Sequence, residues 1–123
     1  MARHLDLGVA GETLAQKALE DRGYKVVDRN VRLRSGELDM VAFDGDELVV
    51  VEVRTRSVGK MAPPETTVGP RKLRKLVRTG RWYVLNKGWE GPWRIDVVAV
   101  TVKGDKNPEV EIFRDVTMGL IEQ

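Results

Sequence analysis

The sequence predicts an α/β fold in which helices flank a central mixed β-sheet, with elements in the order α-β-β-β-α-β-β. Two observations support this prediction. Apolar residues recur at helical spacing near the start and the middle of the chain, and segments rich in β-branched residues lie between and after them. Since 123 residues suffice for one hydrophobic core but not for two, residues 1–123 are expected to form a single domain.

The first predicted helix covers residues 7–22, and Gly23 is expected to end it. Its apolar side chains share one face of the helix: Leu14, Ala15, Ala18 and Leu19. An outer strand is predicted over residues 24–33, where valines occur among charged residues, and a turn at Ser35-Gly36 follows it.

The strongest hairpin signal lies in the middle of the chain. Two β-rich segments, residues 37–43 and 48–54, are separated by residues 44–47, in which Gly45 favours a tight turn. Residues 57–69 follow neither the helical nor the strand period and are expected to form a loop.

The second predicted helix covers residues 70–86, with Pro70 at its first position. The side chains expected on its buried face are Leu73, Leu76, Val77, Gly80 and Val84. Two strands follow at residues 93–102 and 110–116, separated by a turn at residues 104–108.

The composition excludes several classes of protein. The absence of cysteine rules out disulfides and cysteine-based zinc sites. The longest apolar runs, residues 48–51 and 97–100, are far shorter than the ~18 residues needed to cross a bilayer, and Asp6 and Glu12 interrupt any N-terminal signal core. The protein is therefore expected to be cytoplasmic, without a membrane partner.

Opposite charges are segregated along the chain. Residues 54–87 contain ten basic side chains and one acid, a net +9, so the remainder of the chain carries −7 to give the total of +2. This asymmetry favours a polyanionic partner for the basic segment and a cation for acids elsewhere, although a solvated basic helix face is the simpler alternative.

The predicted hairpin brings two acids together. Alternation places Asp39 and Glu52 on the same side of the hairpin, and a turn centred on Gly45-Asp46 sets the two residues directly opposite each other. A turn shifted by one residue leaves Asp39 opposite Val50 and diagonal to Glu52. The two carboxylates are therefore neighbours in either register.

Opposed carboxylates on a largely apolar strand face repel each other, so a positive charge should compensate them. One candidate is a hard divalent cation, Mg²⁺ or Mn²⁺, bound by Asp39 and Glu52. The other is an ion pair with Arg54, which lies two residues from Glu52 on the same face.

Two further acids, Glu12 and Asp96, bear on this site. Glu12 lies on the shoulder of the apolar face of the first helix, from which it can reach a sheet edge, or it is an exposed first-turn acid favoured by the helix dipole. Asp96 is expected to face an arginine, Arg94 or Arg114, and not to join the metal site.

The second predicted helix carries a basic face. Five cations occupy one side of it: Arg71, Arg74, Lys75, Arg78 and Arg81. Trp82 lies among them, a combination that suits phosphate contacts together with base or sugar stacking. The alternative is a solvated face on which Trp82 packs against Trp89 or Trp93.

Three short motifs in a specific order point to a known family: Gly11-Glu12, then Gly36-Glu37-Leu38-Asp39, then Val51-Glu52-Val53-Arg54-Thr55-Arg56. With them the chain resembles the YraN family of bacterial proteins. That family looks like restriction-endonuclease-like PD-(D/E)xK nucleases and is similar in layout to archaeal Holliday junction resolvases. The resemblance extends from the first helix through the strand at residues 94–98, and it implies a restriction-endonuclease-like fold.

The resemblance also implies roles for individual residues. Asp39 and Glu52 would bind Mg²⁺ or Mn²⁺ together with the Val53 carbonyl, supported by Glu12. The function implied is nucleic-acid binding, with DNA favoured over RNA, and metal-dependent cleavage of DNA phosphodiesters, branched DNA included. Since symmetric nucleases commonly pair two sites, a homodimer is also expected.

The sequence departs from the nuclease motif at Arg54, which stands where the family has a lysine. A guanidinium does not lose its proton under ordinary conditions, so Arg54 can hold a phosphate but cannot take over water activation, which implies weakened activity. Arg56 or Lys60 could supply a replacement cation. The alternative function is a non-catalytic DNA- or RNA-binding module, or a protein-interaction module, of the same fold.

Overall fold

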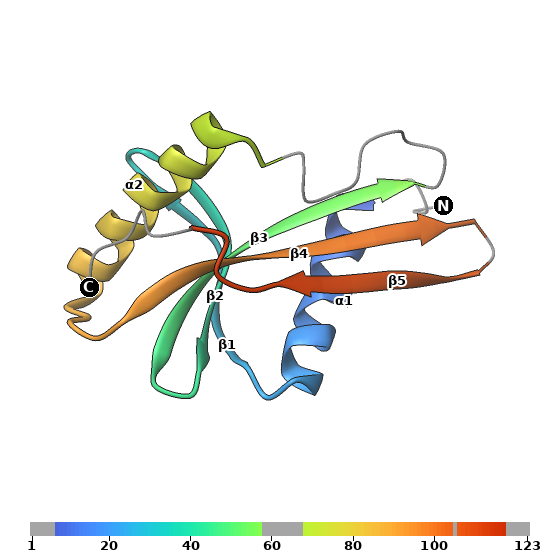
Figure 1. Ribbon diagram of the computed structural model, residues 1–123, viewed down its shortest axis with the longest axis horizontal. Coiled ribbons are helices and arrows are strands. Elements are labelled where there is room, and N and C mark those ends of the chain that lie inside the picture. The colour runs from blue at the N-terminus through green and yellow to red at the C-terminus, as the bar shows by residue number, and fades with distance from the viewer. Residues whose placement is uncertain (1–6, 58–67, 105, 118–123) are drawn as a thin grey trace.

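The computed structural model describes residues 7–57, 68–104 and 106–117. Within them the chain forms one sheet and two helices (Figure 1). The elements are α1 (Leu7–Asp21), β1 (Lys25–Leu33), β2 (Gly36–Asp44), β3 (Glu47–Ser57), α2 (Pro70–Lys87), β4 (Trp93–Lys103) and β5 (Lys106–Phe113). Both the predicted order of elements and the α/β class are confirmed.

The sheet has the strand order β1-β2-β3-β4-β5. β3 and β4 run parallel, while every other neighbouring pair is antiparallel, so the sheet is mixed as predicted. Parallel neighbours cannot be joined by a tight turn, and the connection from β3 to β4 contains α2. This crossover brings the basic helix back over the strand that carries Glu52.

The two helices belong to separate apolar clusters on opposite faces of the sheet. In β3, Leu48 and Val50 pack with α2, whereas the alternate residues Val49 and Val51 pack with α1. Because both faces of β3 are covered, its sequence is a nearly continuous run of valines and not an alternating pattern. Even-numbered residues of β3, Glu52 among them, therefore point to the α2 side.

The β2–β3 hairpin has the register that sets Asp39 opposite Glu52. Asp44 pairs with Glu47 across a two-residue turn in which Gly45 has φ of 62°, a left-handed conformation that favours glycine. The backbone pairing runs back to Met40 and Val51, and the residues of the next pair in this register are Asp39 and Glu52.

The observed boundaries correct two sequence predictions. β5 begins at Lys106 and ends at Phe113, so Pro108, assigned to a turn, lies within the strand. An edge strand tolerates proline because one side of its backbone needs no partner in the sheet. Ser57, assigned to a loop, is the last residue of β3, and the remaining predicted loop falls largely on residues 58–67, outside the described residues.

α2 begins at Pro70, as predicted, after Gly69. Its buried residues are Leu76, Val77, Thr79, Gly80, Tyr83 and Val84, close to the predicted face, while Leu73 is half-buried. At Gly80 a Cβ atom would lie 2.5 Å from the ring of Trp93, so the close approach of α2 to β4 requires a glycine. Neither α1 nor α2, the helices of the described residues, has the length and apolar composition needed to cross a bilayer.

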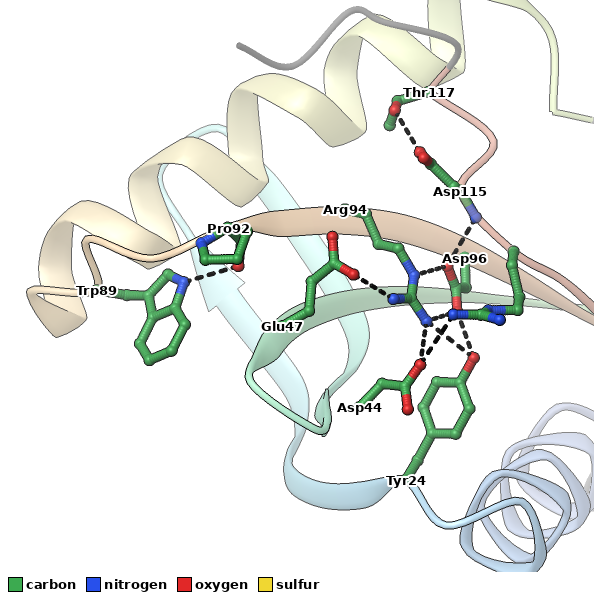
Figure 2. Close-up of polar contacts among 10 residues, drawn as sticks. Tyr24, Asp44, Glu47, Trp89, Pro92, Arg94, Asp96, Asp115 and Thr117 are labelled. Atoms are coloured by element: carbon green, nitrogen blue, oxygen red, sulfur yellow. Dashed lines mark hydrogen bonds and ion pairs between the residues drawn. The ribbon is translucent and has the colours of Figure 1, made fainter. Parts of the chain in front are cut away.

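A buried ionic network lies beneath the hairpin, around Arg94 (Figure 2). The guanidinium is 5% exposed and bonds Asp96 and Asp44, each at 2.8 Å, together with Glu47 and the Tyr24 hydroxyl. The expected pairing of Asp96 with Arg94 is confirmed. Because Arg94 neutralises these acids inside the fold, we assign the network to structural stability and not to the functional site.

Candidate functional site

Asp39 and Glu52, the carboxylate pair, lie where the backbone pairing of β2 with β3 ends. Oδ2 of Asp39 accepts a hydrogen bond of 2.8 Å from the backbone N–H of Val53. The side chain of Asp39 thus takes over contact with β3 one residue after the last backbone pair, and it holds its carboxylate next to that of Glu52. Glu52 is only 4% exposed.

The pKa of Asp39 reveals the electrostatic strain in the carboxylate pair. Burial and, next, the negative charge of Glu52 raise this pKa to about 6, although the hydrogen bond from Val53 and the charge of Lys72 act in the opposite direction. Two acids confined together in this way gain from any further cation that reaches them. The geometry therefore favours cation binding on electrostatic grounds.

Two cations already approach the same oxygen of Glu52. Nη1 of Arg54 lies 3.0 Å from Oε2 of Glu52, and Nζ of Lys72 lies 3.6 Å from it. The ion pair between Arg54 and Glu52, which the sequence offered as the alternative to a bound metal, is therefore present. Lys72 comes from the first turn of α2, and its side chain is 43% exposed.

The contribution of Lys72 to this site escaped sequence reasoning, which counted it only in the basic segment. A signal was available on the helical wheel. With Leu73 set at 0°, Lys72 lies at about −100°, between the buried residues Thr79 and Tyr83. Arg74, Arg78 and Arg81 lie at about 80° to 140°, beyond the other edge of the buried residues. Lys72 is therefore in line with the buried face of α2 at its N-terminal end, whereas the three arginines lie on one flank.

The donor set of the carboxylate pair fits a hard divalent cation. Carboxylate and carbonyl oxygens suit Mg²⁺ and Mn²⁺, and Mg²⁺ commonly takes one or two carboxylates and keeps several waters. Asp39 and Glu52 match that pattern, with the Val53 carbonyl as the third ligand that the resemblance implies. In the described part of the chain, no three or more Asp, Glu or His side chains are grouped so that they could by themselves hold a metal ion.

Glu12 is engaged elsewhere. Its carboxylate lies 3.4 Å from Arg29 of β1, which also bonds Gln16 of α1 at 3.0 Å. α1 packs on the face of the sheet opposite α2, since Ala15 and Leu19 belong to the other apolar cluster. The structure thus places Glu12 in an ion pair with Arg29 and not in one group with the carboxylate pair, and its supporting role stays a prediction.

The basic face of α2 is exposed as expected. All five predicted cations are at the surface, namely Arg71, Arg74, Lys75, Arg78 and Arg81, and we call them the basic row. Trp82 is 47% exposed beside them. Of the two partners that the alternative offered to Trp82, Trp89 packs edge-on against Phe43 and Trp93 is buried against Gly80.

Part of the basic row lines a hollow. Arg74, Val77, Arg78 and Arg81 enclose about 330 Å³ on the flank of α2 that points away from Lys72, and we call this hollow the arginine groove. Arg74 also borders a larger, mostly apolar hollow of about 980 Å³ between the start of α2 and residues 112–117.

The two remaining predicted cations, Arg56 and Lys60, precede α2 in the chain. Arg56 is half-buried in β3, on the same strand face as Glu52 and Arg54. Lys60 lies outside the described residues.

Residues 11–100 match the model of a family described as uncharacterised protein family UPF0102. The chain belongs to the UPF0102 family. This confirms the resemblance to the YraN family. Every predicted site residue, from Glu12 to Trp82, falls within the matched segment of this UPF0102 member.

Relatives of the UPF0102 family match over most of their length. The chain is 49% identical over 108 residues to a UPF0102 protein of Anaeromyxobacter dehalogenans, covering 87% of the chain and 80% of the relative. It is 45% identical over 108 residues to one of Thermotoga petrophila, covering 88% and 94%. With one of Renibacterium salmoninarum the identity is 39% over 115 residues, covering 93% and 98%.

Proposed function

We propose that this UPF0102 member binds nucleic acid, preferentially DNA, along α2 and hydrolyses phosphodiester bonds at the carboxylate pair with the help of Mg²⁺ or Mn²⁺. The observation that carries the proposal is that the half-buried Asp39 and the buried Glu52 meet two cations from different elements, and that one of these elements, α2, also carries the exposed basic row. Acids that hold a metal, beside bases that hold phosphate, are the parts that phosphoryl-transfer sites require.

Asp39 and Glu52 act as the metal-holding groups, and the Val53 N–H keeps the Asp39 carboxylate in place. When bound, the cation supplies Lewis-acid stabilisation of the phosphate and lowers the pKa of a water. The burial of Glu52 limits competing solvent around the pair.

Arg54 and the basic row act on the substrate. Arg54 presents a planar guanidinium that suits phosphate oxygens, so its role is to bind a phosphate oxygen and to stabilise charge that develops on it. The basic row contacts further phosphates, which gives salt-dependent binding with little dependence on base sequence. Trp82 offers an exposed ring on which a base or sugar can stack.

The decisive test is Asp39→Asn, measured by nicking of supercoiled plasmid and by fluorescence anisotropy with a labelled DNA duplex. We expect cleavage to be lost and binding to remain, because the amide still accepts the hydrogen bond from Val53 but is a poor metal ligand. The matched control is Asp46→Asn, an exposed acid in the hairpin turn, which should cleave as the wild type does. Full cleavage by Asp39→Asn would refute the assignment of the site.

A second candidate function is a non-catalytic nucleic-acid-binding module. It is favoured by one observation, that Arg54 and Lys72 already neutralise Glu52 without any metal. In this case duplex binding would be salt-sensitive but indifferent to Mg²⁺, and no protein concentration would nick the plasmid.

A further inference from the structure

Lys72 and the carboxylate pair form a contact that a bound metal would contest. Nζ of Lys72 lies 3.6 Å from Oε2 of Glu52, and its positive charge is also felt by Asp39. A divalent cation held by Asp39 and Glu52 would draw on the same carboxylate oxygens and would repel the ammonium group. Metal and Lys72 are therefore competitors for one buried acid.

Lys72 is able to leave Glu52 at little cost. Its side chain is 43% exposed, and its ammonium group sits at the end of four flexible methylenes. Ion pairs that are this open to solvent are weak, so a stronger charge nearby changes their geometry readily. Glu52, in contrast, is anchored in the middle of the central strand β3 and stays where it is.

We propose that Lys72 is a phosphate-contacting residue that changes partner, pairing with Glu52 in the metal-free protein and with a nucleic-acid phosphate when a divalent cation occupies the carboxylate pair. This inference rests on the proposed function. Metal and nucleic acid then bind cooperatively. The metal releases Lys72 from Glu52 so that it can contact a phosphate, and a phosphate that holds Lys72 leaves Glu52 open to the metal.

The sign of the coupling follows from the contacts. Without nucleic acid, Lys72 competes with the cation, so it weakens metal binding. With nucleic acid, a phosphate takes Lys72 away from Glu52 and the metal binds more tightly. Linkage then requires the metal to tighten nucleic-acid binding by the same factor.

The position of Lys72 separates it from the basic row. The arginine groove lies on one flank of α2, away from Glu52, and so its cations are not tied to the carboxylate pair. Removing them lowers nucleic-acid affinity equally with and without metal. Among the cations of the described part of α2, Lys72 is the one for which the structure gives a contact with Glu52.

The test measures binding of Ca²⁺ and of a labelled DNA duplex at constant ionic strength, for the wild type and for Lys72→Met. Ca²⁺ takes the place of Mg²⁺ so that binding is read without relying on cleavage. We expect Lys72→Met to bind Ca²⁺ alone about two- to fivefold more tightly, as suits the loss of a half-exposed ion pair. The gain in duplex affinity caused by Ca²⁺ should shrink by a similar factor.

Two variants accompany this test. Lys72→Arg should keep the coupling, because it keeps the charge. Lys17→Met makes the same change on the exposed surface of α1, on the other face of the sheet, and should leave both affinities unchanged. Thermal unfolding of each variant checks that the fold is intact.

The outcomes are distinct. If Lys72→Met binds Ca²⁺ more tightly and shows weaker coupling between Ca²⁺ and duplex, the inference is supported. A mere loss of structure would instead lower the affinity for both ligands. If the wild type binds Ca²⁺ and duplex independently, or if Lys72→Met has the same affinities and coupling as the wild type, the inference is overturned while the proposed function stands. A wild type that binds neither overturns the proposed function itself.

Discussion

The Asp39 carboxylate accepts a hydrogen bond from the backbone N–H of Val53 at the point where β2 separates from β3. This side-chain bond continues the pairing of the two strands after their last backbone pair. It also fixes an acid beside the buried Glu52, at the cost of confining two like charges. The same interaction thus contributes to strand pairing and to the chemistry of the site.

The stability of the protein should fall as Asp39 ionises. Its pKa is about 6 in the folded protein, raised by burial and by Glu52 from an ordinary value of 3.8. Well below pH 4 the carboxyl is protonated in both states and makes no difference. As the pH rises from about 4 to about 6, the unfolded state loses its proton while the folded state keeps it, so the free energy of unfolding decreases, and the decrease ends above about 6, where both states are ionised.

We therefore expect Asp39→Asn to gain stability relative to the wild type between pH 4 and pH 7. Denaturant unfolding of both proteins across this range measures the difference. For Asp46→Asn, which alters an exposed carboxyl, the difference in free energy of unfolding from the wild type should hardly change with pH. If the Asp39→Asn difference were also independent of pH, the raised pKa would be refuted.

Arg54→Lys should increase phosphodiester cleavage by about tenfold or more, because an ammonium group can lose its proton beside the attacking water and a guanidinium cannot. Plasmid nicking rates in Mg²⁺ measure this change. Arg22→Lys, an equivalent replacement in the exposed turn that follows α1, serves as control and should leave the rate as it is. An unchanged rate in Arg54→Lys would show that the departure from the lysine motif does not limit activity.

Replacing Arg74, Arg78 and Arg81 by glutamine should reduce the salt dependence of duplex binding. Each phosphate contact contributes about 0.9 to the slope of log affinity against log salt, so the loss is about 2 to 3 if all three arginines touch phosphate. Anisotropy titrations at several salt concentrations give the slope. The same three-charge change at Lys17, Lys25 and Lys106, exposed elsewhere, should leave the slope near that of the wild type.

Gly80→Ala should destabilise the fold by about 1–3 kcal/mol, since the added methyl group overlaps the Trp93 ring and must push α2 away from β4. Thermal or denaturant unfolding measures the loss. Asn86→Ala, on the exposed side of the same helix, should change the free energy of unfolding by less than about 0.5 kcal/mol. Equal stability of the two variants would mean that the helix adjusts without strain.

Local patterns were sufficient to predict the hairpin and the carboxylate pair. Alternation and the Gly45 turn depend on neighbours in sequence, and together they determine which residues face each other across β2 and β3. The start of α2 could also be predicted from local sequence, because proline is favoured in the first turn of a helix and Pro70 lies there.

Contacts between distant segments were harder to predict. Lys72 meets Glu52 only because the crossover returns α2 to β3, and a helical wheel shows the direction of Lys72 but not the strand that it meets. Asp96 was expected to pair with an arginine. The approach of Asp44 and Glu47 to the same guanidinium could not be predicted locally, because it depends on the side-by-side pairing of β2, β3 and β4. The prediction of a turn at Pro108 was wrong because a turn and an edge strand accommodate proline equally well.

The buried Arg94 also decides how β4 aligns with its neighbour. Each residue of β4 faces the side opposite to the next one, so sliding the strand by one position along β3 would turn the guanidinium away from Asp44 and Glu47 and into the apolar cluster under α2. An unpaired charge buried there costs several kcal/mol. Arg94 thus excludes misaligned sheets, and the parallel strands acquire a unique register that a row of interchangeable valines could not specify.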